Sequence, residues 1–184
     1  CVSRCRRFGK SMAAKMLCAY YDKSCDSRDL FRGLEIEKHP SFEKHLNKYP
    51  VIYVDMTDFV TRFRGERSIV DAIQRTLMDD LADVYTEVAV RENDDWMEYL
   101  RRIAQHAGER FVLIIDEWDA ICREFEGDSQ TMGEYVNLLR RMFKSSSALD
   151  VFAGVYMTGI FPIKKYRTES ALNNFREYSM IDPK

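Results

Sequence analysis

An unbroken apolar run, "FVLIID" at Phe111–Asp116, constrains the fold of this 184-residue chain more than any other feature. Successive side chains of a strand point to opposite faces, so a strand that is apolar at every position must be buried on both faces. A parallel sheet that is covered by helices on both sides provides that environment. The run therefore predicts a buried central strand in an α/β fold.

The segments on either side of this run alternate between strand and helix patterns. Short β-branched and apolar runs at Val51–Met56, Val151–Gly159 and Glu177–Ile181 predict further strands, and Cys1-Val2-Ser3 is expected to end another. Strands that alternate with helices indicate a parallel sheet. The expected fold is an α/β three-layer sandwich, with a mostly parallel central sheet flanked by helices.

Helix signals fill the intervals between the predicted strands. Apolar residues recur at helical spacing directly after Gly9-Lys10-Ser11, which predicts a helix there. Two further helices are expected to begin after Ser68 and Asp95, which have the side chains of helix N-caps. Gly108 is expected to end the helix that Asp95 begins. A further helix is predicted to begin at Thr131. Aromatic residues at core spacing are expected to be buried, namely Tyr20, Tyr21, Phe31, Tyr53, Phe111, Tyr135, Phe143, Phe152 and Tyr156.

The stretch Phe8-Gly9-Lys10-Ser11 matches the end of a phosphate-binding loop. In such a loop, backbone N–H groups and a helix N-terminus hold the phosphates, the lysine reaches the β- and γ-phosphates, and the hydroxyl binds Mg²⁺. The full pattern, G-x-x-x-x-G-K-S/T, has a glycine where this chain has Arg4. Taken alone, the stretch therefore fits a solvated basic turn as well as a nucleotide site.

A second signal lies where the apolar run ends, in Asp116-Glu117. A P-loop ATPase needs an aspartate there that steadies Mg²⁺ through its water shell, and many add a carboxylate that activates the attacking water. Thr158 ends the next predicted strand, where a polar residue can sense the γ-phosphate. Each residue alone has a plainer explanation, such as a strand that ends in solvent. Together with Gly9-Lys10-Ser11 they favour a nucleotide site.

These residues can form one site only if the strands have a particular order. Lys10, Asp116 and Thr158 have to converge on one Mg–phosphate group at the carboxyl edge of the sheet. We therefore expect the strand before the loop to lie next to Val151–Thr158, and that strand to lie next to Phe111–Asp116.

Four segments together resemble the bacterial predicted AAA-ATPase-like family: "SRCRRFGKSMAAKML", "LFRGLEIEKHPSFEKHLNKYPVIYVDM", "IIDEWDAICRE" and "MTGIFPIKKYRTESALNNFREYSM". The family's loop reads roughly T-R-P-R-R-F-G-K-S, so Arg4 is the family's own form of the motif. The resemblance implies a P-loop NTPase fold, ATP as the ligand and Mg²⁺ as the metal ion.

The resemblance also implies roles for single residues. Phosphate binding falls to Arg6, Arg7, Phe8, Gly9, Lys10 and Ser11. Mg²⁺ binding falls to Ser11 and, through water, to Asp116. Catalysis falls to Glu117, Lys10 and Thr158, and Asp119 and Gly159 also match the family.

Two positions depart from the family's pattern. Cys5 stands where members usually have proline, which leaves the loop less rigid because proline fixes φ. Pro162 stands where many members carry an arginine, so a transition-state cation would have to come from Lys164, Lys165 or Arg167.

The expected function is ATP binding and Mg²⁺-dependent ATP hydrolysis. The alternative is a nucleotide-responsive switch or scaffold that recruits a partner and does not hydrolyse ATP. A metabolic kinase fits less well, because such an enzyme positions an acceptor and rarely needs the second carboxylate of Asp116-Glu117.

The amino-acid composition of the chain limits the classes of partner and the cell compartment that we expect. A net charge of −2 gives no global basic field for nucleic acid, and the apolar runs are far shorter than the roughly 20 residues that cross a membrane. Five cysteines without a C-x-x-C pair argue against zinc and fit a reducing cytoplasm. Residues 1–184 are expected to be a single domain that begins within the first strand and lacks the family's C-terminal nuclease-like region. Nucleic acid would then be contacted only through missing regions, and a homo-oligomer stays open.

Overall fold

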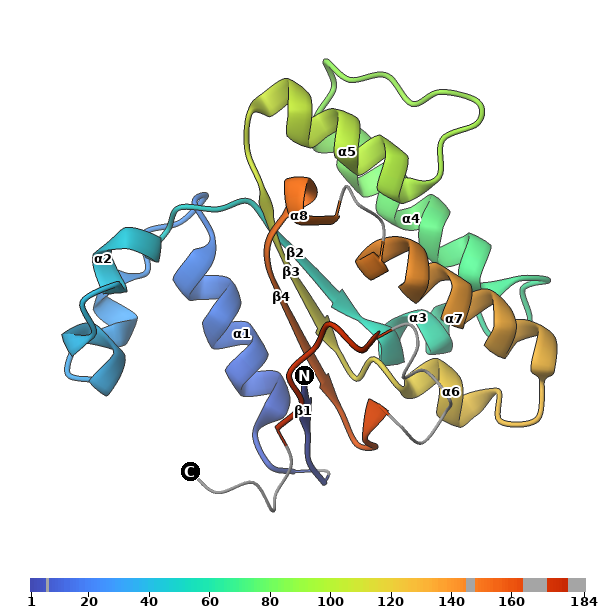
Figure 1. The fold of residues 1–184 in the computed structure, drawn as a ribbon, viewed down its shortest axis with the longest axis horizontal. Helices are drawn as coiled ribbons and strands as arrows, with labels where there is room; N and C mark the ends of the chain where they lie inside the picture. The colour runs from blue at the N-terminus through green and yellow to red at the C-terminus, as the bar shows by residue number, and fades with distance from the viewer. Residues whose placement is uncertain (6, 145–147, 164–171, 179–184) are drawn as a thin grey trace.

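A parallel sheet forms the centre of the molecule in the computed structural model, which describes residues 1–5, 7–144, 148–163 and 172–178. The described residues form four strands in the order β1-β4-β3-β2 (Figure 1). The strands are β1 (Val2–Ser3), β2 (Val51–Asp55), β3 (Phe111–Asp116) and β4 (Phe152–Gly159). All three pairings between them are parallel. The predicted α/β class is confirmed, and so is the predicted order of the loop strand, β4 and β3.

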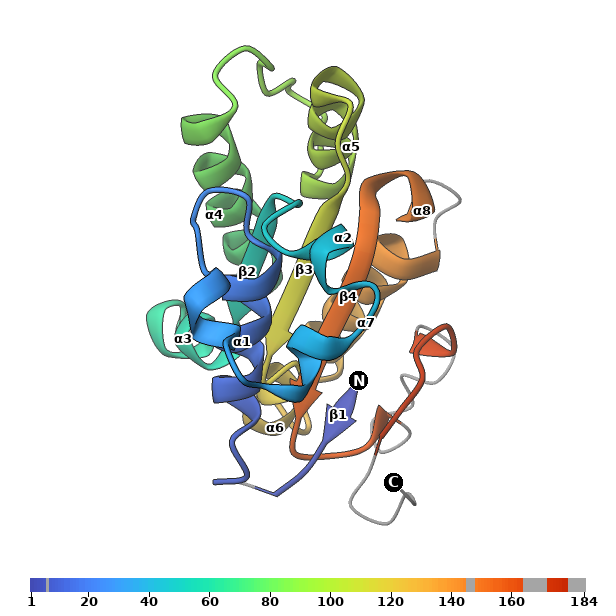
Figure 2. The same cartoon turned by 90° about the vertical axis from the view of Figure 1, so that its left-hand side faces the viewer.

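Helices cover the two faces of this sheet unequally. Figures 1 and 2 show α1 on one face and α4, α5 and α7 on the other. The α-helices are α1 (Lys10–Tyr21), α2 (Phe42–His45), α3 (Met56–Arg62), α4 (Ile69–Val84), α5 (Trp96–Ala107), α6 (Ala120–Glu124), α7 (Ser129–Lys144) and α8 (Ala148–Val151). Two 3₁₀ turns, Arg28–Phe31 and Glu35–Lys38, lie between α1 and α2. The layers are those of the P-loop-like sandwich expected from the sequence.

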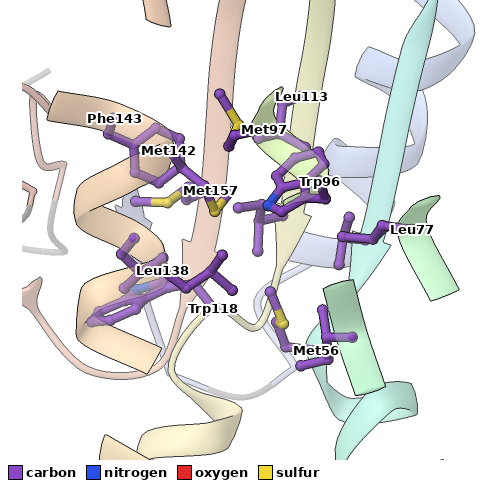
Figure 3. Close-up of a cluster of buried hydrophobic side chains, with 14 of the residues drawn as sticks. Met56, Leu77, Trp96, Met97, Leu113, Trp118, Leu138, Met142, Phe143 and Met157 are labelled. Carbon is purple, nitrogen blue, oxygen red and sulfur yellow. The ribbon is translucent and has the colours of Figure 1, made fainter. Parts of the chain in front are cut away.

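The central strand β3 is buried at every position, as its apolar run predicts. Leu113 and Ile115 pack into the main core with residues of α4, α5 and α7. Val112 and Ile114 point to the other face, where they pack with Ala14 of α1. Figure 3 shows Leu113 in the main core together with Trp96 from α5. Burial on both faces fixes β3 between two helical layers.

The helices begin where short polar side chains cap them. Asp95 accepts a hydrogen bond from the Glu98 backbone N–H at 2.8 Å, and Ser68 accepts one from the Asp71 N–H at 3.2 Å. Both caps were predicted, and Gly108 ends α5 in the left-handed conformation with φ 66°. Such caps satisfy backbone donors that have no partner within the helix.

Two element boundaries differ from the sequence-based prediction because an aspartate caps a helix earlier. β2 ends at Asp55 rather than Met56, since the Asp55 carboxylate accepts the Thr57 N–H at 2.9 Å and starts α3 at once. α7 begins at Ser129 rather than Thr131, because Asp128 accepts the N–H of Gln130 at 3.0 Å. The spacing of apolar residues, from which the strands and helices were predicted, does not indicate where these caps lie.

The ends of two predicted strands also differ. β4 begins at Phe152, because Val151 ends the short helix α8. Of the predicted strand Glu177–Ile181, Tyr178 forms a parallel bridge with Val2, and residues 179–181 lie outside the described residues. The bridge is close: the Ser3 N–H donates to the Tyr178 carbonyl at 3.0 Å, and the Tyr178 N–H donates to the Cys1 carbonyl at 2.9 Å.

Most of the aromatic residues expected in the core are buried there. The buried ones are Tyr20, Phe31, Phe111, Tyr135, Phe143 and Phe152. Tyr21 and Tyr156 are half-buried. Tyr53 contradicts the prediction, because it is 36% exposed and its hydroxyl serves a polar group at the sheet edge.

Replacing Asp95 tests the predicted cap of α5. Its carboxylate caps the helix and also pairs with Arg141 of α7 at 3.1 Å. We expect Asp95→Ala to lower the free energy of unfolding by about 1 kcal/mol, and Asp95→Asn to retain most of it, because asparagine also caps helices well. Chemical denaturation measures both. Asp83→Ala is the control, since Asp83 is exposed near the end of α4 and caps nothing there; an equal loss in Asp83→Ala would contradict the assignment.

Candidate functional site

The carboxyl ends of β1, β3 and β4 meet the start of α1, and a buried ammonium group lies at this point. Lys10 is the first residue of α1 and is only 6% exposed. Its Nζ donates to the carbonyl oxygens of Arg4 at 3.0 Å and Cys5 at 3.2 Å. It also forms an ion pair with Glu117 Oε1 at 3.2 Å. The structure therefore brings together Lys10 and Glu117, which the sequence places in one site.

The loop between β1 and α1 turns through two residues in the left-handed conformation. Gly9 has φ 72° and Arg7 has φ 66°. Glycine adopts this conformation readily because it has no Cβ, whereas a non-glycine residue pays roughly 1–2 kcal/mol. The Gly9 carbonyl accepts the Ala13 N–H at 2.9 Å and so begins the helix. Gly9 thus allows a tight turn into α1, while Arg6 lies outside the described residues.

A cavity of about 420 Å³ opens between this loop and the segment after β3. Its described lining consists of Arg7, Phe8, Gly9, Lys10, Ser11, Met12, Thr57, Glu117 and Arg123. Three of these residues are cationic and one is anionic. The volume is in the range of pockets for small-molecule ligands, and the charge favours an anion. Five of the six residues expected to bind phosphate line this cavity.

Asp116 lies beside this cavity, at the end of β3, and its carboxylate is almost completely buried. It is 1% exposed. Thr158 of β4 donates its hydroxyl hydrogen to Asp116 Oδ1, and Tyr53 of β2 donates its hydroxyl hydrogen to Oδ2 at 3.2 Å. Burial, followed by the charge of Asp116, raises the pKa of Tyr53 above its usual value near 10, so this phenol stays a proton donor at neutral pH. The two neighbouring strands therefore both stabilise the Asp116 carboxylate.

Thr158 connects the two carboxylates that follow each other in the chain. Its hydroxyl oxygen accepts the Glu117 backbone N–H at 3.1 Å while its hydrogen is on Asp116. Glu117 itself has φ 53°, an uncommon left-handed conformation for a non-glycine residue. This turn directs the chain away from β3 and places the Glu117 side chain beside Lys10.

Arg123 completes the surroundings of Glu117. Its Nη2 contacts Glu117 Oε2 at 3.0 Å, and its Nη1 pairs with Asp119. Asp119 is fully buried, and its carboxylate also accepts the backbone N–H of Phe161 at 3.1 Å and that of Ile160 at 3.3 Å. The Glu117 carboxylate is therefore held on one oxygen by Lys10 and on the other by Arg123.

Trp118 and Gly159 fix the backbone behind these side chains. The backbone N–H of Trp118 donates to the Thr158 carbonyl at 2.8 Å. The backbone carbonyl of Trp118 accepts a hydrogen bond from the Tyr135 hydroxyl of α7 at 2.6 Å. Figure 3 shows the Trp118 side chain directed toward α7. A Cβ on Gly159 would lie 2.5 Å from Trp118 Nε1. The Gly159 carbonyl also accepts the Arg4 N–H at 3.1 Å, so this close packing positions the start of the loop.

The sequence-based prediction gave no site role to four residues that the structure places in or beside the site: Met12, Tyr53, Thr57 and Arg123. Thr57 lines the cavity because Asp55 starts α3 directly after β2. Arg123 follows Asp119 by four residues, the spacing of a helical ion pair, and this spacing was its only signal in the sequence. The expected alternatives for a further cation, Lys164, Lys165 and Arg167, lie outside the described residues.

The described residues hold no group of three or more His, Cys, Asp or Glu side chains that could bind a metal ion by themselves. Within the same part of the chain, no helix combines the length and apolarity needed to cross a membrane.

Comparison with known proteins identifies the family. The sequence model of the family described as "Predicted AAA-ATPase" matches residues 1–168. The chain therefore belongs to this AAA-ATPase-like family, as its motifs suggested. No curated protein matches the chain.

Substitution of Gly159 tests the packing behind the site. We expect Gly159→Ala to lower the free energy of unfolding by roughly 1–3 kcal/mol, because the new methyl group overlaps the buried Trp118 ring. Gly154→Ala is the matched control on the same strand, since among the described residues no heavy atom beyond its own chain neighbours lies within 4 Å of the added Cβ. Chemical denaturation compares the two. Equal stability of both variants would show that the close approach is not a constraint.

Proposed function

We propose that this protein binds ATP and hydrolyses it with Mg²⁺ in the cavity between the β1–α1 loop and Glu117. The observation that carries the proposal is the Lys10–Glu117 ion pair at 3.2 Å, which lies at the carboxyl edge of a parallel sheet. Membership in the AAA-ATPase-like family supports the same ligand.

Lys10 is the proposed anchor of the triphosphate. A buried ammonium group is costly unless anionic or polar groups surround it, and here two backbone carbonyls and one carboxylate do so. Phosphate oxygens can replace these partners with a gain in charge complementarity. The N-terminus of α1, a helix of 12 residues, adds backbone N–H groups and a favourable dipole.

Ser11 and Asp116 are the proposed ligands of Mg²⁺. Mg²⁺ prefers oxygen donors and usually combines one or two carboxylates with phosphates and water rather than an all-protein cage. Ser11 is an exposed residue of the cavity lining. Asp116 is buried and is not among the described lining residues, so its carboxylate, which precedes Glu117, would act on the metal ion only through water. When bound, the metal ion would neutralise charge on the phosphates.

Glu117 is the proposed general base. Its carboxylate lines the cavity with 17% of the side chain exposed, so it can accept a proton from a water molecule beside the terminal phosphate. The water oxygen then forms a bond to the terminal phosphorus, and the bond from that phosphorus to the ADP oxygen breaks. The products are ADP and inorganic phosphate, and the proton resides on Glu117.

Thr158 acts, in this proposal, by orienting the two carboxylates. It is fully buried and is not among the described residues that line the cavity. Its single hydroxyl hydrogen is donated to Asp116, and its oxygen accepts the backbone N–H of Glu117.

A cytoplasmic location is also part of the proposal, because all five cysteines are free thiols, the state in which a reducing compartment keeps them.

Paired variants test the proposal. We expect Lys10→Ala to weaken ATP binding and abolish turnover together, because the ammonium holds the phosphates in both the ground state and the transition state. We expect Glu117→Gln to lower the rate of phosphate release by about 10²–10⁴, the usual contribution of a general base, while ATP affinity is kept or raised. Calorimetric binding and steady-state phosphate release, each with and without Mg²⁺, measure the two effects.

Lys15→Ala and Glu126→Gln are the matched controls, because both residues are exposed and neither lines the cavity. Both should behave as wild type. If wild-type protein binds ATP with Mg²⁺ but Glu117→Gln releases phosphate equally fast, the hydrolytic role of Glu117 is wrong. If wild-type protein binds ATP but releases no phosphate, the non-hydrolysing switch describes the protein better.

A further inference from the structure

Arg123 is a cation of the cavity to which the sequence motifs give no role. It lies in α6, which follows β3 at the carboxyl end of the sheet (Figure 1). Its side chain is 20% exposed and lines the cavity together with Lys10 and Glu117. A cation in this position, partly withdrawn from water, interacts with an anion more strongly than an exposed surface arginine does.

The geometry around Glu117 indicates what Arg123 can hold. Lys10 binds Oε1 and Arg123 binds Oε2 of the same carboxylate, at 3.2 and 3.0 Å. The two cations therefore flank a group whose oxygens are separated by the width of one carboxylate. The oxygens of one phosphoryl group are similarly spaced. Lys10 and Arg123 are thus placed so that both can contact a single terminal phosphate beside Glu117.

Arg123 is also held firmly in this orientation. Its Nη1 pairs with the fully buried Asp119, which in turn accepts two backbone N–H groups from the segment after β4. A guanidinium has five N–H donors in a fixed plane, so the contacts with Asp119 and Glu117 leave donors for a ligand. This anchoring lowers the conformational entropy that binding would otherwise cost.

We infer that Arg123 is a specificity-determining residue whose guanidinium contacts the terminal phosphate, so that the site distinguishes a nucleoside triphosphate from a diphosphate. The inference rests on the proposed function and deepens it. The loop residues Gly9-Lys10-Ser11 line the cavity at the start of α1, whereas Arg123 comes from α6 and contacts the Glu117 oxygen that Lys10 does not. In the proposed function the terminal phosphate lies beside Glu117, so it is the phosphate that Arg123 would contact.

The test compares a non-hydrolysable triphosphate analogue, AMP-PNP, with ADP, each with Mg²⁺. Calorimetry gives the affinities for wild type, Arg123→Gln and Arg123→Lys. Glutamine can still donate a hydrogen bond to Asp119 but carries no charge. We expect Arg123→Gln to reduce the preference for AMP-PNP over ADP by about 10- to 100-fold, the range for a lost charged hydrogen bond, while the ADP affinity stays at the wild-type value.

Arg123→Lys keeps the positive charge but lacks the planar guanidinium, so it should reduce the preference for AMP-PNP over ADP about threefold. Arg64→Ala is the control. Arg64 is exposed, pairs with Glu124 of α6, the helix that carries Arg123, and is not among the described residues that line the cavity. An unchanged ADP affinity also shows that each variant is folded. If Arg123→Gln does not fold, Arg123→Lys decides, and an unchanged preference there contradicts the inference.

Two results would overturn the inference while leaving the proposed function intact. One is a wild-type preference for AMP-PNP in Arg123→Gln. The other is an equal loss of AMP-PNP and ADP affinity, which would mean that Arg123 supports the cavity as a whole. If wild-type protein binds neither nucleotide, the proposed function itself fails and the inference fails with it.

Discussion

The burial of negative charge at the end of β3 is the constraint on which the candidate site depends. Asp116 and Asp119 are 1% and 0% exposed, and a buried carboxylate is costly unless it is paired and hydrogen-bonded. The order of the strands supplies the partners of Asp116, because Thr158 comes from β4 on one side and Tyr53 from β2 on the other. Asp119 is paired with Arg123 one helical turn later and also accepts the backbone N–H groups of Ile160 and Phe161, which follow β4. The sheet thus stabilises its own charged edge.

Two cations of the cavity, Lys10 and Arg123, are paired within the protein before any ligand arrives, whereas the third, Arg7, is exposed. Lys10 has a carboxylate and two carbonyl groups around it, and Arg123 has two carboxylates. At Lys10 and Arg123, a polyanion that enters the cavity would therefore exchange one set of partners for another instead of meeting bare cations. Net affinity is then the difference between two strong interactions. In the proposed function Glu117 is central to this exchange, because phosphate oxygens would replace it beside Lys10 and Arg123.

Local patterns in the sequence predicted the elements well, whereas the missed site residues depend on tertiary packing. The run Phe111–Asp116 had to be buried on both faces, which fixed the fold class and the position of Asp116. Tyr53 was assigned to the core from its aromatic character, but β2 is at the edge of the described sheet, so its ring is partly exposed and its hydroxyl reaches Asp116. Arg123 is part of the site because the left-handed conformation of Glu117 turns its side chain toward α6. The spacing of apolar residues in the sequence does not indicate such a backbone conformation.

The short strand β1 has its partners at the opposite end of the chain, which affects the order of folding. Ser3 is hydrogen-bonded to Tyr178, Arg4 is hydrogen-bonded to Gly159, and the amino group of Cys1 donates to the Arg176 carbonyl, 175 residues away. Contacts of such high sequence separation form late, because the closure of a long loop must precede them. During synthesis at roughly 5–20 residues per second, β1 therefore stays unpaired until its partners at residues 158–178 have been made. The loop before α1 becomes fixed only then, so in the proposed function nucleotide binding during synthesis would indicate that β1 has joined the sheet.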